Sequence, residues 1–545
     1  MTDLSVQSRI IEQPMPPSSG HESRKGSDAQ HVKVSLAPNR RNLWFCRAIL
    51  LCILLVQTVL SLRLTNTAFE DEALYLYAGH LHLDHLINGA PYHGEFTQYF
   101  SGSPLLYPVL AALIDSVCGL AGARALSLVF MLGATALLYS LSRLLFQERA
   151  ALCTAAVFSV TQSTLTLGNL ATHDAPVIFL LALASWIVVQ SADSRSPLLC
   201  LIAAPVLALS VAVKYAALVY VPVVLLIAAF VVFRHCGRRQ LILCGLLLPT
   251  TTGAILLCAL RVVSASYLEG LKRTTTERER GTASVIDLLS DSALWGGLMV
   301  ALALLGTILY AKQGCVRKAA SDSTEGLPSR LWRLAFGLTL TSAAFLAPLY
   351  QMHLHTETSL HKHIGYGLLF AAPMAGVALT RLAGARFRQL YAVISIWVVL
   401  LMMGVAQAQS RYYSWPDSSG LVAFLEPLLT RNGHYLLETR WPATYYLRNE
   451  SDPQQWASTY YINYTDPRGA VHKGDDGYKA AIRNGYFDIV VLTNTTTKAR
   501  SDKIGQQLDS SKNYRFLSQL SMGDHFPSSR YRIWVKRRSP VKRGK

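Results

Sequence analysis

Charged residues are scarce in this sequence. They make up 15% of the 545 residues, whereas about 25% is usual for a soluble domain. Apolar residues make up 51%, and the mean hydropathy is +0.28. This composition excludes a soluble enzyme, a disordered scaffold or a nucleic-acid-binding domain as the main class. The formal net charge of +18 is then expected from basic cytoplasmic loops of a membrane protein, and we predict no nucleic acid among its partners.

Motifs for nucleotides, disulfides and zinc are also lacking. The sequence contains neither a P-loop nor a Rossmann glycine fingerprint, and it has no internal repeat. The nine cysteines lie mostly inside apolar runs, with none after Cys315. That distribution is typical of small buried hydrophobic residues, and it favours neither a disulfide framework nor a zinc site.

The hydropathy pattern predicts eleven membrane-spanning helices. The first, residues 43–64, has about 22 residues, enough to cross the hydrocarbon core at about 1.5 Å per residue. The others cover residues 124–146, 150–168, 175–192, 197–213, 215–233, 240–262, 293–312, 331–350, 360–380 and 389–409. The apolar stretch 104–120 is short and contains two prolines and Asp115, which favours a helix lying at the membrane interface.

The basic residues determine the orientation of these helices. If the stretch 104–120 does not cross, every short loop on the side of the N-terminus is basic, as the positive-inside bias requires. Residues 1–42 are polar and basic and begin without an apolar run, which predicts a disordered cytoplasmic arm, not a cleaved signal peptide. An odd number of spans then places the C-terminus outside the cytoplasm.

The predicted chain therefore has three parts. Residues 1–42 form the arm, residues 43–409 form a transmembrane domain with a long first outer loop at 65–123, and residues 410–545 form an extracytoplasmic domain. The last part is polar and contains a helical segment, SSGLVAFLEPLL, followed by the strand-like runs HYLLET, FDIVVL, YRFLSQL and RIWVK. We predict a small α/β domain there, attached to a polytopic α-helical membrane protein.

Carboxylates lie where two predicted helices begin on the outer face. Glu70, Asp71 and Glu72 follow the first membrane exit, and Asp174 begins the span near Pro176. Acidic residues in a first helical turn are favoured by the helix dipole and by capping, which is one explanation of both groups. Ionisable residues at membrane depth are costly and more often functional, which is the other.

Cations lie on the same predicted face. Lys214 is isolated between apolar segments, Arg124 begins the second span, and the loop 263–292 contains Lys272 and Arg273. Each could be a snorkelling or solvated side chain instead of an anion-binding one. Carboxylates and cations together suit group transfer from a lipid phosphate, because a carboxylate takes the proton of an acceptor hydroxyl while cations stabilise the departing phosphate.

The order of these motifs resembles the GT-C membrane glycosyltransferases of the dolichyl-phosphate-mannose protein mannosyltransferase type, which include the lipid A aminoarabinose transferases. In that family an Asp-Glu pair opens the first outer loop, as Asp71-Glu72 does here. The resemblance continues with an aromatic segment starting at Tyr99, then Arg124, Asp174, Lys214 and a late segment HKHIGYGLLFAAPMAG that contains Lys362.

The resemblance implies a fold, a reaction and roles for these residues. It implies an inverting transfer from a polyprenyl-phosphate sugar to a hydroxyl of a protein, lipid or polysaccharide. Asp71 would be the general base, with Glu72 and Asp174 shaping or ligating around it. Lys214 and Arg124 would lie near the lipid phosphate, and Tyr99, Lys272, Arg273 and Lys362 are further candidates for substrate binding. The aminoarabinose transferases lie in the bacterial plasma membrane, which is the localisation we predict.

Two departures from the family pattern affect the phosphate contacts. Aminoarabinose transferases have a Lys where this chain has Ser103, so that contact would come from the basic loop 263–292. The late segment has His361-Lys362-His363 before its aromatic residue, where the family usually has Arg-Tyr.

The cofactor and the competing functions stay open at this point. A divalent metal held by Asp71, Glu72 and Asp174 is an alternative, although their spacing matches no specific ligand pattern and no cofactor is certain. A transporter or lipid flippase is the main rival function, but the sequence shows no related halves. A non-catalytic assembly or polysaccharide-binding membrane protein, in which the tail would be the working part, is the third.

Overall fold

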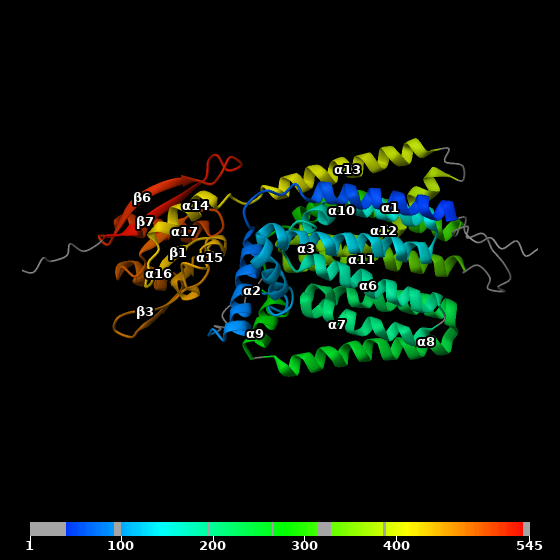
Figure 1. Ribbon diagram of the computed structural model, residues 1–545, viewed down its shortest axis with the longest axis horizontal. Helices are drawn as coiled ribbons and strands as arrows, with labels where there is room; N and C mark the ends of the chain where they lie inside the picture. Colours follow the sequence, from blue (N-terminus) through cyan, green and yellow to red (C-terminus); the bar gives the residue numbers. More distant parts are fainter. Residues whose placement is uncertain are drawn as a thin grey trace, which may run out of the picture.

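The structure is a computed structural model that describes residues 40–91, 100–194, 196–263, 265–278, 280–313, 329–384 and 389–537. A bundle of long helices forms one end of the molecule, and a smaller domain with helices and strands forms the other (Figure 1). The helix α2 (Glu70–Asn88) lies between them, across the end of the bundle.

Eight helices among the described residues are long and apolar enough to cross a membrane. They include or coincide with α1 (Arg40–Ser61), α3 (Tyr107–Leu145), α6 (Asp174–Asp193), α8 (Val221–Val262), α10 (Val285–Gln313), α11 (Arg330–Leu354), α12 (Leu360–Ala383) and α13 (Leu390–Tyr412). The predicted class, a polytopic α-helical protein, is confirmed.

Backbone breaks explain why eight long helices cover most of the eleven predicted segments. In α8 the residue Gly237 has φ 83°, and it separates the predicted spans 215–233 and 240–262. In α3 the residue Gly119 has φ 64°, and it separates the stretch 104–120 from the next span. Glycine adopts such positive φ values without a Cβ clash, so the chain can change direction there.

Two predicted spans are built from shorter pieces. Residues 150–168 form α4 (Glu148–Ser159) and α5 (Gln162–Leu167), and residues 197–213 form η2 (Pro197–Ile202) and α7 (Ala203–Val213). These pieces are helical as predicted, but each is too short to be counted among the eight.

The helix α12 is the core of the bundle. It packs against α10, α11 and α4, and most of its residues are buried. Small residues allow the close approach: a Cβ added at Gly306 of α10 would come within 1.9 Å of the carbonyl oxygen of Met374. The first turn of α12, which contains Lys362, is thereby held rigidly at the end of the bundle near α2.

The C-terminal part is an α/β domain, as predicted. Its sheet has the order β2-β1-β5-β7-β6, with β1, β2 and β5 parallel and β6 and β7 antiparallel. The strands are β1 (Tyr435–Leu437), β2 (Trp456–Ser458), β5 (Ile489–Leu492), β6 (Tyr514–Ser521) and β7 (Arg530–Lys536), and β3 (Asn463–Thr465) pairs with β4 (Val471–Lys473). The helices are α14 (Ser419–Leu425), η4 (Glu426–Leu428), α15 (Trp441–Tyr446), η5 (Pro453–Gln455), α16 (Gly474–Arg483) and α17 (Lys498–Ser510).

Candidate active site

Charged side chains from four elements meet at the end of the bundle next to α2. Asp71 and Glu72 come from the first turn of α2, and Asp174 from the first residue of α6. Lys214 follows α7, and Lys362 lies in the first turn of α12. The predicted carboxylates and two of the predicted cations therefore converge, although they are far apart in the sequence.

Asp71 forms an ion pair with Lys362. The Lys362 Nζ lies 2.6 Å from the Asp71 Oδ2, and it also lies 4.9 Å from the centre of the Phe69 ring. The Lys362 side chain is only 3% exposed, whereas that of Asp71 is 35% exposed. Asp71 is therefore the accessible member of the pair.

Asp174 is buried and fully engaged. Its Oδ1 accepts hydrogen bonds from the Lys214 Nζ at 2.5 Å and from the Tyr366 hydroxyl at 2.9 Å. The Thr172 hydroxyl donates to Oδ2 at 3.1 Å. Such a carboxylate is stable away from water because it is paired and hydrogen-bonded.

Lys214 is placed by a break between two helices. It has extended backbone angles, φ −152° and ψ 126°, between α7 and η3 (Tyr215–Tyr220). The neighbouring segment packs on this break, with the Ser103 N–H donating to the Ala212 carbonyl oxygen at 2.8 Å. A Cβ added at Gly102 would lie 1.9 Å from the carbonyl oxygen of Val213, so only glycine fits there.

Glu72 has no exposed surface and serves the architecture of the site. Its two oxygens accept from the Arg124 Nε and Nη2 at 2.9 and 2.8 Å, a bidentate ion pair. The same oxygens accept the backbone N–H groups of Phe69 at 2.9 Å and Ala171 at 2.7 Å. Arg124 also donates to the carbonyl oxygen of Asn66 at 2.9 Å. This pair thus joins α2 to α3 and to the loop before α6.

Comparisons with known proteins agree with this architecture. The sequence profile of the family described as dolichyl-phosphate-mannose-protein mannosyltransferase matches residues 103–263. No curated protein matches the sequence at a significant level. Among solved structures, ArnT from Cupriavidus metallidurans, bound to undecaprenyl phosphate, has a TM-score of 0.57 at 15% identity over 91% of this chain and 98% of that chain. The chain has the GT-C fold.

A second solved structure has the same fold. The oligosaccharyltransferase AglB from Archaeoglobus fulgidus, in complex with an inhibitory peptide and a dolichol-phosphate, has a TM-score of 0.50 at 11% identity. The match covers 90% of this chain and 74% of that chain. Together with the family profile, these structures confirm the predicted resemblance and support a glycosyltransferase over a transporter.

The remaining predicted residues of this GT-C chain have different positions. Arg273 pairs with Glu269 at 2.6 Å on α9 (Ala265–Thr274), and Lys272 lies in the last turn of that helix. Of the basic loop 263–292, Arg278 is the residue that interacts electrostatically with His363, beside Lys362. Tyr99 lies outside the described residues.

Sequence reasoning did not single out Tyr366. Its hydroxyl donates to Asp174, and it lies four residues after Lys362, on the same face of α12. That spacing was a signal in the sequence, but it had meaning only once the start of α12 was known to face Asp174.

The three carboxylates do not fit a metal site. Asp71, Glu72 and Asp174 each have a cationic partner in Lys362, Arg124 or Lys214. Within the described residues no group of three His, Cys, Asp or Glu side chains could hold a metal ion. We therefore derive no step of the reaction through a metal.

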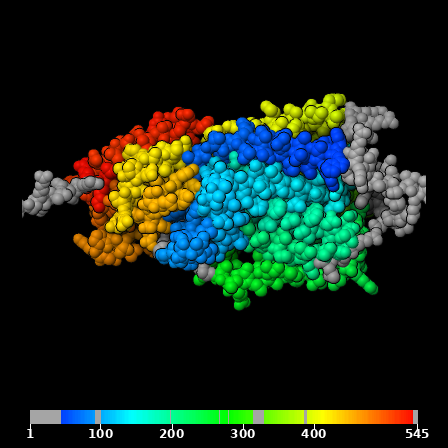
Figure 2. Space-filling model, in the orientation of Figure 1, coloured from blue at the N-terminus to red at the C-terminus, as the bar shows by residue number. Residues whose placement is uncertain are grey.

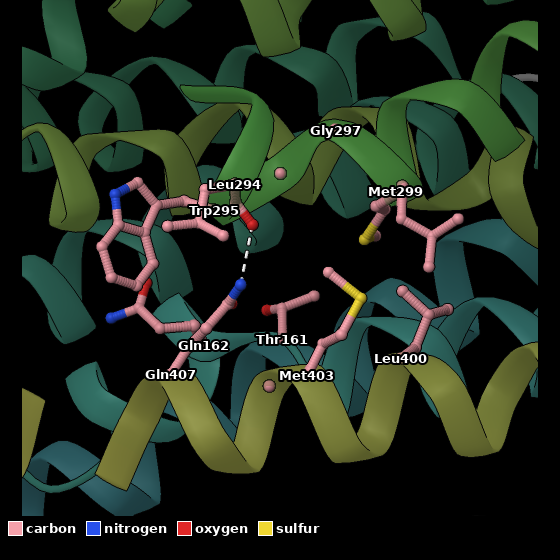
Figure 3. A pocket seen from close by; sticks show the side chains of 12 residues that line it. Thr161, Gln162, Leu294, Trp295, Gly297, Met299, Leu400, Met403 and Gln407 are labelled. Carbon is pink, nitrogen blue, oxygen red and sulfur yellow. Dashed lines mark hydrogen bonds between the residues drawn. The ribbon is translucent and has the colours of Figure 1, made fainter. Parts of the chain in front are cut away.

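Two hollows lie near the site without including its exposed carboxylate. A cavity of about 500 Å³ lies beside Arg124, between the end of α1, α3 and Tyr446. A narrower pocket lies where α10 and α13 approach Thr161 and Gln162, and the Gln407 side chain crosses it to the Leu294 carbonyl oxygen at 2.7 Å (Figure 3). Asp71 lines neither of them.

Proposed function

We propose that this protein is an inverting glycosyltransferase that moves a sugar from a polyprenyl-phosphate donor to an acceptor hydroxyl on the extracytoplasmic side of the membrane. The observation that carries the proposal is the exposed Asp71 beside the buried ammonium group of Lys362, at the end of a GT-C bundle. The family profile and the fold support glycosyl transfer. The undecaprenyl phosphate in ArnT and the dolichol-phosphate in AglB support a polyprenyl-phosphate donor.

The acceptor hydroxyl is activated by Asp71. The carboxylate takes the hydroxyl proton while the acceptor oxygen forms a bond to the anomeric carbon of the donor sugar. The bond from that carbon to the phosphate oxygen breaks, and its electron pair leaves with the polyprenyl phosphate. Because the acceptor attacks from the face opposite to the leaving group, the configuration inverts.

The ion pair of Asp71 and Lys362 changes during this step. Before reaction, Lys362 orients Asp71 and balances its charge across 2.6 Å. When Asp71 takes up the proton it becomes neutral, and the ammonium charge of Lys362 is then available to the phosphate, which gains negative charge as it leaves. Lys214 interacts electrostatically with Lys362 and adds a second cation. The positive charge of Lys362 thus stabilises the leaving phosphate as it forms.

Glu72 and Asp174 act as positioning residues in this proposal. Glu72 uses both oxygens on Arg124 and two backbone N–H groups, so it is not available as a base. Asp174 orients Lys214 and Tyr366. The guanidinium group of Arg124 is likewise occupied, by Glu72 and by the Asn66 carbonyl oxygen. Arg124 therefore supports the turn that carries Asp71 and does not contact the phosphate.

The orientation and location also belong to the proposal. α12 begins next to Asp71 and has Arg381 in its last turn, at the far end of the bundle. Arg143 and Lys312 lie in the last turns of α3 and α10. Because basic residues favour the cytoplasm, we place the active site and the α/β domain outside. The similarity to ArnT from Cupriavidus metallidurans supports a bacterial plasma membrane as the location.

The test is a transfer assay on purified protein in lipid nanodiscs with a panel of radiolabelled polyprenyl-phosphate sugars. We expect the wild type to release polyprenyl phosphate, and Asp71→Asn to lose about 10²–10⁴-fold in rate, since general bases contribute that much. Asp84→Asn, an exposed carboxylate on the same helix, is the control and should keep the rate. Equal rates for the wild type and Asp71→Asn would overturn the assignment.

A further inference from the structure

The α/β domain is fixed directly onto the segment that leads into the catalytic turn. The Trp415 Nε1 donates to the Thr67 carbonyl oxygen at 2.9 Å, and the Ser418 N–H donates to the Thr67 hydroxyl at 3.0 Å. The Ala68 N–H donates to the Tyr446 hydroxyl at 2.9 Å. The space-filling view shows the domain and α2 in contact along this junction (Figure 2). The position of the domain relative to Asp71 is therefore well defined.

Three parallel strands of this domain end at one edge of the sheet. Leu437 of β1 is in register with Ser458 of β2 and with Val491 of β5. The chain after these strands continues as Glu438, as the segment 459–461, and as the segment 493–497. We call these the strand-end loops. In open α/β sheets, ligands bind outside the carboxyl ends of the parallel strands, which is where the strand-end loops lie.

Glu438 organises the strand-end loops. Its Oε2 accepts the N–H groups of Thr493 and Asn494 at 2.8 and 2.7 Å, and its Oε1 accepts those of Thr495, Thr496 and Thr497 at 3.0, 2.8 and 2.9 Å. Burial alone would raise the pKa of Glu438, but these backbone donors lower it below the ordinary value. The charge of Glu438 is thus stabilised by backbone donors within the strand-end loops. These hydrogen bonds hold a row of threonines in place.

The strand-end loops lie within electrostatic range of the catalytic turn. Partial burial and the nearby carboxylates Glu70, Glu438 and Asp71 raise the pKa of the Tyr460 hydroxyl, which also hydrogen-bonds the Thr496 side chain. Burial, Asp71 and Glu438 raise the pKa of Glu70 to about 7. Tyr460 and Glu438 of the strand-end loops therefore interact electrostatically with Glu70, and Tyr460 also with Asp71.

The chemistry of this region favours hydroxyl groups as ligands. Tyr460 is 46% exposed and Tyr461 is 55% exposed, so both present aromatic faces as well as hydroxyls. The threonines of the strand-end loops add groups that both donate and accept. Glu70, with a pKa of about 7, can also do either. An anionic acceptor is disfavoured, because Asp71 and the ionised form of Glu70 would repel it.

We propose that the strand-end loops of the α/β domain, with Tyr460 at their centre, bind a neutral polyhydroxylated acceptor, a carbohydrate, and direct one of its hydroxyls to Asp71. This inference rests on the proposed function for the transfer step, but the binding it describes is independent of turnover. The aromatic face of Tyr460 packs on the sugar ring, and the threonine hydroxyls satisfy its hydroxyl groups. The acceptor is then a glycan in place of a peptide side chain.

The experiment measures acceptor binding directly. The protein in nanodiscs is mixed with a panel of methyl glycosides and, separately, with short serine and threonine peptides, and saturation-transfer NMR reports which of them bind. We expect a methyl glycoside to bind the wild type and Tyr460→Ala to weaken it about tenfold, as for a lost hydrogen bond together with a lost aromatic contact. Phe516→Ala, a similarly exposed aromatic of the same domain on β6, is the control and should bind like the wild type.

Kinetics then separate a role in acceptor binding from a structural one. With an acceptor glycoside, Tyr460→Ala should raise the acceptor KM about tenfold, in line with the binding loss, while Phe516→Ala leaves the acceptor KM unchanged. Tyr460→Phe should recover most of the loss, because it retains the aromatic face. If no glycoside binds, if Tyr460→Ala binds like Phe516→Ala, or if only peptides bind, the proposal is overturned. Glycoside binding with no donor turnover would instead contradict the proposed function alone.

Discussion

At the scale of single residues, three chemically similar carboxylates have different surroundings, and we therefore propose different roles for them. Asp71 has one partner and an exposed side, so a substrate can reach it. Glu72 is saturated by Arg124 and backbone donors, and Asp174 by Lys214 and Tyr366. Exposure and free hydrogen-bonding capacity distinguish the proposed base from the two proposed positioning groups, whereas the residue types alone do not.

The pKa of Glu70 makes a prediction about stability. Glu70 lies outside the membrane-spanning helices, and burial beside Asp71 and Glu438 raises its pKa from 4.5 to about 7. The folded protein therefore favours the protonated form of Glu70. The contribution of Glu70 to the stability of the folded protein falls as the pH rises from about 4.5 to about 7, and it is constant at higher pH. Glu70→Gln removes this loss.

We expect Glu70→Gln to raise the melting temperature by a few degrees relative to wild type at pH 8 and to leave it unchanged at pH 4.5. Thermal unfolding followed by intrinsic fluorescence across this pH range checks it, with Asp84→Asn giving a pH-independent difference. A Glu70→Gln shift of the same size at every pH would show that Glu70 does not titrate in this window.

The pair of Lys214 and Asp174 makes a second prediction. Lys214→Met leaves a buried carboxylate without its cation, which costs about 3–5 kcal/mol of stability. The double variant Lys214→Met/Asp174→Asn removes both charges, and we expect it to recover most of the melting temperature. Its transfer rate should stay low, because one of the two cations for the leaving phosphate is missing. A double variant with wild-type activity would exclude Lys214 from the reaction.

At the scale of elements, α2 is fixed from both sides. On one side the segment before it is held by Arg124 of α3, through the Asn66 carbonyl oxygen. On the other side the buried Asp115 of α3 accepts from the His80 Nε2 of α2 at 2.6 Å and from the Tyr445 hydroxyl of α15 at 2.6 Å. Asp115, singled out in the sequence because it interrupts an apolar stretch, thus joins three elements.

α15 is expected to influence catalysis through the catalytic turn. Tyr446→Phe removes the acceptor of the buried Ala68 N–H, three residues before Asp71, at a cost of about 1–3 kcal/mol. A looser turn should lower kcat several-fold and leave the donor KM nearly unchanged, since Lys214 and Lys362 are untouched. Steady-state kinetics with varied donor check this, and the exposed Tyr391→Phe on α13 is the control. A rise in donor KM with constant kcat would instead place Tyr446 in donor binding.

At the scale of the whole molecule, the active site lies at the junction of two parts that are stable for different reasons. The bundle buries its backbone polar groups within helices, as any membrane-spanning segment must. The α/β domain has its own apolar clusters around β1, β5 and β7. Asp71 of α2 interacts electrostatically with Tyr460 of the α/β domain, so in our proposal both parts contribute to one site.

Much of this architecture could be predicted from the sequence. Hydropathy, a local property, located all eleven helical segments and the α/β tail, because lipid and sheet each require their own residue pattern. The predicted helix starts identified Asp71, Glu72 and Asp174, and the predicted topology singled out the cations Arg124 and Lys214. The resemblance added Lys362. The lengths of the helices were less predictable, because the breaks at Gly119 and Gly237 depend on packing, which hydropathy does not report.

Which charged side chains pair with one another was decided only by the tertiary structure. Lys362 is 291 positions from Asp71, and no periodicity relates them; they meet because α12 is the buried centre of the bundle and begins beside α2. The same packing pairs Arg124 with Glu72 and Lys214 with Asp174. It also brings the Tyr446 hydroxyl to the Ala68 N–H. The sequence by itself determined which charged residues lie at the ends of the apolar segments, since that depends on local composition. Which of them is exposed, and so able to react, depends on contacts between distant segments and was decided by the fold.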